Sequence, residues 1–164
     1  MPPIRSDQPL IPSVLDRLLD DDPSVSREVP KSRTQVLREL KQSVRRDLEN
    51  LLNTRCRCNP LPPHLGELGV SLAGYGIPDV TGADLGSVRK REEFRRQIER
   101  TIRSFEPRFK TVSVAILETG NPLDRTLRFR IEGLLRAEPA PEPVAFDSSV
   151  EPATGTVEVR GATA

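Results

Sequence analysis

The chain is poor in the residues on which most catalytic and metal sites depend. Its 164 residues include one histidine, two cysteines, one tyrosine and no tryptophan, and only 4% are aromatic. A nucleophilic triad would have to use His64, which lies in a proline-rich stretch, and the chain has no Gly-x-Ser-x-Gly motif. Because aromatic side chains are so scarce, we expect a core of Leu, Val and Ile with a few Phe.

The two cysteines, Cys56 and Cys58, are separated by a single residue. They are too few and too close together for a disulfide framework. Together with His64 they supply three soft ligands, whereas a structural zinc site needs four, usually with wider cysteine spacing. The glycines between residues 66 and 76 match neither the P-loop nor the dinucleotide pattern. The sequence therefore predicts no metal, no cofactor and no small-molecule substrate.

Charge is plentiful but nearly balanced. Charged residues make up 30% of the chain and the net charge is only +1, which argues against a general nucleic-acid binder. Residues 31–58 carry eight Lys or Arg against three acids, and residues 88–108 carry eight against four. Residues 1–30 and 137–164 have the opposite excess, with six acids against three bases and five against one. This pattern favours complementary surfaces for protein neighbours over nucleic acid.

Long hydrophobic runs are also missing. The first 30 residues lack the basic start and apolar stretch of a signal peptide, and no run approaches membrane-spanning length. We expect a soluble cytoplasmic protein that does not insert into a membrane.

Three segments have the apolar spacing of amphipathic helices: a short one at residues 9–22, and long ones at 32–53 and 88–105. Ser32 or Thr34 is suited to cap the second helix and Ser87 the third. The apolar stripes of the two long helices are Val36, Leu37, Leu40, Val44, Leu48, Leu51 and Leu52 in the first, and Phe94, Ile98, Thr101, Ile102 and Phe105 in the second.

After Pro107 the apolar period changes to two, which predicts strands at residues 110–118 and 127–135. Residues 144–150 and 156–160 are expected to add a hairpin that turns near Gly155. Residues 54–87 are rich in Pro and Gly and read as irregular. The expected fold class is α+β, with two long helices and a short N-terminal helix packed on a small, mostly antiparallel sheet.

The most distinctive local feature is Glu106-Pro107-Arg108, at the junction of the last helix and the first strand. Proline ends a helix and displaces the residue before it from helical geometry, so Glu106 is a corner residue. We expect the carboxylate and the guanidinium to be exposed there as a handle for another protein, since Arg is suited to two-pronged pairing with carboxylates. An exposed Arg108 would contribute little to folding stability.

Four ordered motifs resemble one known family. Residues 13–21, 47–55 and 71–79 and the Phe-Glu-Pro-Arg corner are similar to the TssE family of type VI secretion baseplate subunits. The corner matches the signature of the wider family of phage baseplate wedge proteins, once labelled tail lysozymes. The resemblance runs in order from about residue 9 to residue 136.

The resemblance implies a structural role and not an enzymatic one. It divides the chain into a flexible start at residues 1–8, a wedge domain at 9–136 and an acidic, Pro-rich extension with a hairpin at 137–164. The implied partners are the baseplate subunits TssF, TssG and TssK and the contractile sheath, in a cytoplasmic assembly docked at the inner membrane. Glu106, Pro107 and Arg108 are the implied partner-binding residues.

Four further residues in or beside the motifs are secondary interface candidates: Arg55, Tyr75, Pro78 and Asp79. Two other functions remain open. One is a peptidoglycan hydrolase, a lysozyme-like glycosidase using Glu106, although the neighbouring Arg108 would favour the ionised carboxylate and disfavour a general acid. The other is a regulatory adaptor that binds a helix of some other protein.

Overall fold

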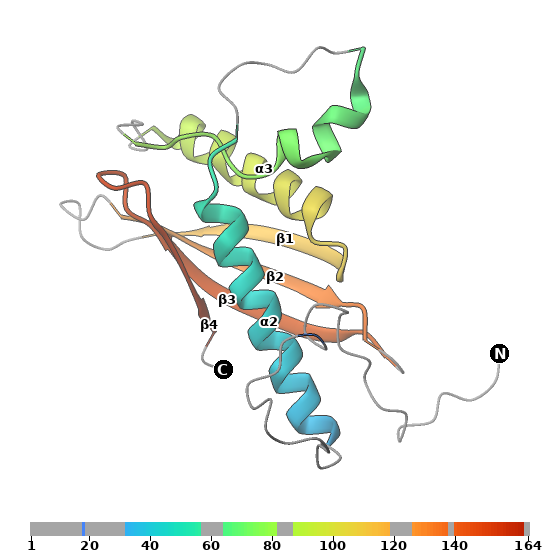
Figure 1. Ribbon diagram of the computed structural model, residues 1–164. Coiled ribbons are helices and arrows are strands. Elements are labelled where there is room, and N and C mark those ends of the chain that lie inside the picture. Colours follow the sequence, from blue (N-terminus) through green and yellow to red (C-terminus); the bar gives the residue numbers. More distant parts are fainter. Residues whose placement is uncertain are drawn as a thin grey trace.

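The computed structural model describes residue 18 and residues 32–56, 64–81, 87–118, 126–137 and 140–162. Two long helices pack against one four-stranded antiparallel sheet (Figure 1). This confirms the α+β class. The predicted short helix at residues 9–22 lies, apart from Leu18, outside the described residues, as does the predicted flexible start at residues 1–8. The elements in chain order are α2 (Arg33–Asn53), η1 (Gly66–Val70), η2 (Leu72–Gly74), α3 (Val88–Phe105), β1 (Phe109–Leu117), β2 (Leu127–Leu135), β3 (Glu142–Val150) and β4 (Val157–Gly161).

Helix α2 begins with the predicted cap. The Ser32 hydroxyl accepts from the Gln35 N–H at 3.3 Å, and the Gln35 side chain accepts from the Ser32 N–H at 2.8 Å. This reciprocal arrangement satisfies two amide groups at the start of the helix. Most of its apolar stripe is buried, with Val44, Leu48 and Leu52 fully inaccessible, whereas Leu37 and Leu40 are half-buried.

Helix α3 buries Phe94, Ile98, Thr101 and Ile102. Its arginines lie on the remaining surface, where several pair with glutamates one turn away. Ser87 occupies the N-cap position as predicted, although its side chain makes no capping hydrogen bond.

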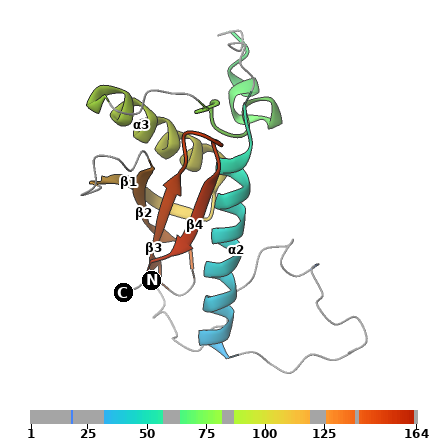
Figure 2. The ribbon, with the colours of Figure 1, turned by 90° about the vertical axis from the view of Figure 1, so that its left-hand side faces the viewer.

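The sheet is a simple meander in the order β1-β2-β3-β4, with every neighbouring pair antiparallel (Figure 2). Along most of each strand buried and more exposed residues alternate, because successive side chains point to opposite faces. In β1 the alternation breaks at Lys110 and Thr111, where the register with β2 shifts. The buried face contacts the helices: α3 packs against β1, and α2 packs against β4. Both helices and all four strands contribute to a single, mainly aliphatic core that also contains Phe129 and Phe146.

The hairpin expected within residues 137–164 is present. Its turn includes Gly155, whose φ of +69° favours glycine. Val144, Phe146, Val150, Val157 and Val159 are buried in the same core as the rest of the sheet. β3 pairs with β2, and β4 pairs with β3, so residues 142–161 complete the sheet that begins in the predicted domain at 9–136.

Neither of the two long described helices is apolar enough along its length to cross a lipid bilayer.

Candidate protein-interaction site

The helix-to-strand corner has the predicted backbone path. The Glu106 N–H donates the last helical bond to the Ile102 carbonyl at 2.9 Å, and the Phe109 N–H then donates to the Glu106 carbonyl at 3.3 Å. Glu106 itself has left helical geometry, with φ −119° and ψ 82°. Pro107 is exposed at the outer tip of the turn, and β1 begins two residues later.

The Glu106 side chain turns inward, and the residue is only 6% exposed. Its Oε1 accepts from the Arg108 backbone N–H at 3.2 Å and from Arg108 Nε at 2.7 Å. Its Oε2 accepts from Arg108 Nη2 at 2.5 Å. The guanidinium therefore holds both oxygens of the carboxylate in a two-pronged pair.

Arg108 also reaches across to α2. Its Nη1 donates to the Ser43 hydroxyl at 2.9 Å, and its Nη2 donates to Asp47 Oδ2 at 2.6 Å. Burial alone would lower the pKa of Arg108, but the hydrogen bonds and negative charges of Glu106 and Asp47 outweigh it and raise that pKa. We refer to Ser43, Asp47, Glu106 and Arg108 as the corner network.

The corner network corrects the expectation that both charged side chains are exposed. The Glu106 side chain is 7% exposed and that of Arg108 is 19% exposed. The expectation failed because α2 supplies a second carboxylate and a hydroxyl at this point. Sequence reasoning missed Ser43 and Asp47, yet one signal was available: Asp47 is polar but lies three residues after Val44 and four before Leu51, on the apolar stripe of α2.

Tyr75 lies beside the corner network. Its ring packs edge-on against Phe105, the last residue of α3, with the ring centroids 5.3 Å apart. Burial raises the pKa of Tyr75, and the negative charges of Asp47 and Glu106 raise it further. The structure thus brings this secondary candidate to the main corner.

The other secondary candidates form a separate cluster at the end of α2. Arg55 Nη1 donates to the Leu52 carbonyl at 3.3 Å, its Nη2 donates to the Gly155 carbonyl, and its Nε lies 3.6 Å from Asp79 Oδ1. Arg55 therefore ties α2 and the loop after Ile77 to the β3–β4 turn. The guanidinium has three partners within its own chain.

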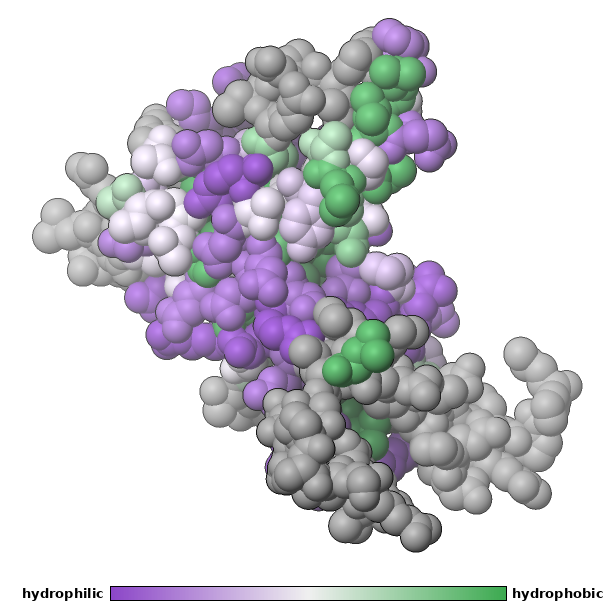
Figure 3. Space-filling view, in the orientation of Figure 1, coloured by the Kyte–Doolittle hydropathy of each residue, from purple (hydrophilic) through white to green (hydrophobic). Residues whose placement is uncertain are grey.

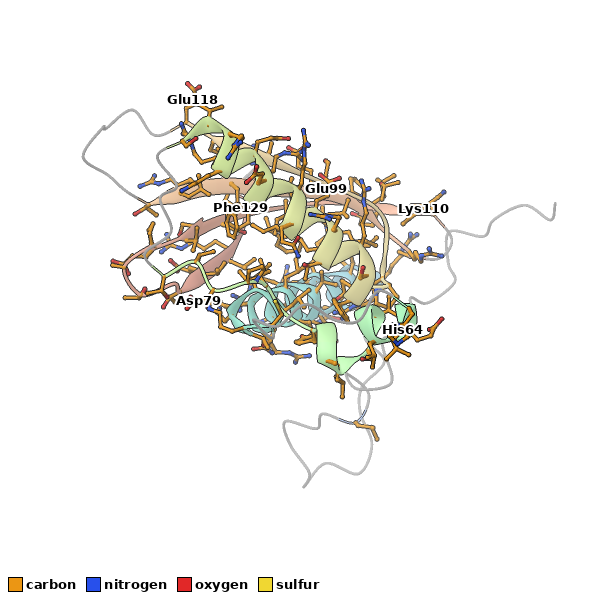
Figure 4. The ribbon with its side chains drawn as sticks, turned by 90° about the horizontal axis from the view of Figure 1, so that it is seen from above. His64, Asp79, Glu99, Lys110, Glu118 and Phe129 are labelled. Atoms are coloured by element: carbon orange, nitrogen blue, oxygen red, sulfur yellow. The ribbon has the colours of Figure 1, made fainter. Side chains whose placement is uncertain are left out.

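Pro78 and Asp79 are both exposed beside this cluster, and Figure 4 shows Asp79 at one side of the molecule, away from His64. Asp79 Oδ1 accepts from the Thr81 N–H at 2.9 Å. This hydrogen bond and a further one from the Thr81 side chain lower the pKa of Asp79, with a smaller contribution from the charge of Arg55.

The remaining chemistry-bearing residues do not converge. Within the residues that the structure describes, no three His, Cys, Asp or Glu side chains are grouped as metal ligands would be. Cys56 is a half-buried free thiol, and Cys58 lies outside the described residues. Both oxygens of Glu106 are occupied by Arg108, an arrangement that does not favour its use as a glycosidase acid.

These observations define a small α+β module in which Glu106, the most buried charged residue among those described, pairs with Arg108 at a backbone corner. A family model described as baseplate wedge protein gp25 matches residues 38–140. The chain belongs to this family, and it is a structural component of a baseplate that associates with other baseplate subunits. Neither the comparison with curated proteins nor the comparison with solved structures gave a match.

Proposed function

We propose that the chain is the TssE-type wedge subunit of a type VI secretion baseplate, where it links other wedge subunits to the contractile sheath. The observation that carries the proposal is the match to the baseplate wedge family over residues 38–140. That range contains three of the four motifs that resemble the TssE family, including the corner. The proposed partners are TssF, TssG, TssK and the first sheath ring, in a cytoplasmic complex docked at the inner membrane.

The corner formed by Glu106, Pro107 and Arg108 is the proposed partner-binding site, and each of the three residues has a different role. Pro107 is exposed and would contact the partner directly. Glu106 is buried, and its pair with Arg108 holds the turn in one shape. Arg108 keeps 19% of its side chain exposed, so it would contribute a partial contact in addition to its internal role.

The segment next to Tyr75 supports a second contact on the same side of the molecule. Leu65, Val70 and Leu72 are 45%, 59% and 89% exposed, although they are large and apolar. Figure 3 shows hydrophobic surface, in green, over the part of the molecule where η1 and η2 lie. An isolated exposed leucine is unremarkable, but three within eight residues are typical of a surface that a neighbouring subunit covers.

Pro78 and Asp79 are proposed as a peripheral part of the interface because both are exposed. Arg55 and Tyr75 are proposed to act indirectly. Arg55 holds the loop that carries Asp79, and Tyr75 packs on the end of the helix that leads to the corner.

Co-expression with the TssF- and TssG-type subunits of the same system, followed by size-exclusion chromatography, tests the proposal. We expect the chain to elute with them as one complex, and deletion of its gene to abolish sheath assembly in cells. Separate elution together with normal sheath assembly after deletion would refute the proposal. A muramidase assay on purified cell wall is the companion experiment, and activity that is lost in Glu106→Gln would instead establish the hydrolase function.

A further inference from the structure

The first outer strand of the sheet, β1, has side chains of α3 bonded to its main chain. Arg103 Nη2 donates to the Val112 carbonyl at 3.1 Å, and Arg95 Nη1 donates to the Val114 carbonyl at 3.1 Å. The Val114 N–H donates to Glu99 Oε2 at 3.3 Å. Since β1 pairs with β2 on its other side, these three groups face away from the sheet.

The three α3 side chains hold one another in place. Glu99 lies 2.8 Å from Arg95 and 2.7 Å from Arg103, at one-turn spacing along the helix. Figure 4 shows Glu99 on α3, on the side of the helix that overlies β1. Such a cluster presents two donors and one acceptor to the strand, as a further strand would.

The main chain of the second outer strand, β4, is likewise bonded by side chains of a helix, here α2. Asn53 Nδ2 donates to the Val157 carbonyl at 2.7 Å, and the Val157 N–H donates to Asn53 Oδ1 at 2.9 Å. A side-chain amide that exchanges both bonds with one residue reproduces the hydrogen-bonded pair of an antiparallel ladder. Arg45 Nη1 adds a bond to the Val159 carbonyl at 3.0 Å, and it is held by Glu49 at 3.1 Å.

We infer that these five side chains close both edges of the sheet against strand addition, so that the isolated chain does not pair edge to edge with a second copy of itself. Outer strands with unpaired N–H and C=O groups are templates for such pairing. Here three main-chain groups on each outer strand already have side-chain partners. A second β4 strand could bind only after Asn53 and Arg45 had been displaced. The inference concerns the free subunit and does not depend on the proposed wedge function.

The test opens the β4 edge in the full-length chain with the double variant Arg45→Ala/Asn53→Ala. Sedimentation velocity over a range of concentrations measures self-association. The net contribution of one hydrogen bond changes an equilibrium constant by about fivefold. The double variant frees three main-chain groups of β4 for pairing, so its dimerisation constant should rise by about tenfold or more. Hydrogen exchange of the peptide that contains β4 should slow as the variant dimerises, because its free amides then gain partners.

The matched control is Arg38→Ala/Asn50→Ala, which removes the same two residue types from exposed positions of the same helix. We expect it to behave as the unmodified chain. A double variant that melts cooperatively yet stays monomeric wherever the control is monomeric would overturn the inference. If the double variant does not fold, Asn53→Ala alone decides the question by the same criterion, since it frees both groups of Val157.

Discussion

The carboxylate of Glu106 and the guanidinium of Arg108 face each other on the inside of the turn around Pro107, with Arg108 Nε 2.7 Å from Glu106 Oε1. Two residues that adjoin the same proline therefore point their charges into the molecule and leave the proline outside. Because Arg108 also contacts Asp47 on α2, the shape of the corner depends on a helix that precedes it by about sixty positions (61 between Asp47 and Arg108). The buried ion pairs of Arg108 therefore hold the corner in place, and with it the position of the exposed Pro107.

Replacement of Arg108 by Ala should destabilise the fold. It leaves Glu106 buried without its cation, and breaking a buried ion pair costs about 3–5 kcal/mol, somewhat less where one partner keeps contact with water. Urea unfolding followed by circular dichroism measures the loss. Arg100→Ala, at an exposed position on α3, is the control and should change the free energy of unfolding by less than about 0.5 kcal/mol. Equal effects of the two substitutions would show that the corner network does not stabilise the fold.

Asp47→Asn should weaken the same network from the α2 side. The substitution keeps the shape of the side chain but removes the negative charge that faces Arg108. We therefore expect the free energy of unfolding to fall by about 1–2 kcal/mol. A double-mutant cycle of Asp47→Asn with Arg108→Ala should give a coupling free energy of about 0.5–3 kcal/mol, because the two side chains are in direct contact. If the two substitutions lower the free energy of unfolding additively, the contact between Asp47 and Arg108 does not contribute to stability.

Tyr75 should titrate above its ordinary range in the folded chain. Burial and the charges of Asp47 and Glu106 raise its pKa above the value of 10.0 expected in the unfolded chain. The folded state thus retains the phenol proton, and the stability linked to Tyr75 is fully present below that value and falls as the pH rises through it. Since the chain has one tyrosine and no tryptophan, ultraviolet absorbance of the tyrosinate reports this group alone. Asp47→Asn should lower the pKa of Tyr75, and a pKa that does not change on unfolding in urea would contradict the structure.

Gly155→Ala should destabilise the C-terminal hairpin. A side chain there would adopt a positive φ and would place its Cβ 2.7 Å from the Arg55 guanidinium and 2.9 Å from the Thr81 hydroxyl. The backbone penalty alone is about 1–2 kcal/mol, and displacement of Arg55 adds to it. Gly66→Ala is the control, because no atom lies within 4 Å of its added Cβ. Thermal melting distinguishes the two, and similar melting temperatures would argue against the role of Arg55 as a tie to this turn.

Leu72→Ser should leave the fold unchanged and weaken the proposed assembly. The side chain is 89% exposed, so the free energy of unfolding should change by no more than about 0.5 kcal/mol. Val88→Ser is the comparison, because Val88 is also apolar and 75% exposed but lies at the start of α3. Co-elution with the wedge subunits should fall for Leu72→Ser and not for Val88→Ser. If both variants co-elute as the unmodified chain does, the segment around η1 and η2 is not an interface.

The bounds of the elements follow from local sequence. Both long helices, the two strands after Pro107 and the hairpin turn at Gly155 were predicted to within about two residues, because apolar periodicity, caps and proline act over a few positions. The family resemblance was likewise contained in short motifs, and the match over residues 38–140 confirms that the chain belongs to the baseplate wedge family.

Only the tertiary structure decided where the charged side chains point. Glu106 and Arg108 turn inward because Asp47 and Ser43 approach from α2, and Asn53 bonds to Val157 across 104 positions of sequence. Such contacts depend on how a helix lies over a sheet, which periodicity does not encode. Local pattern determined which segments fold into helix and strand, and long-range packing determined which of these polar groups bond to distant parts of the chain.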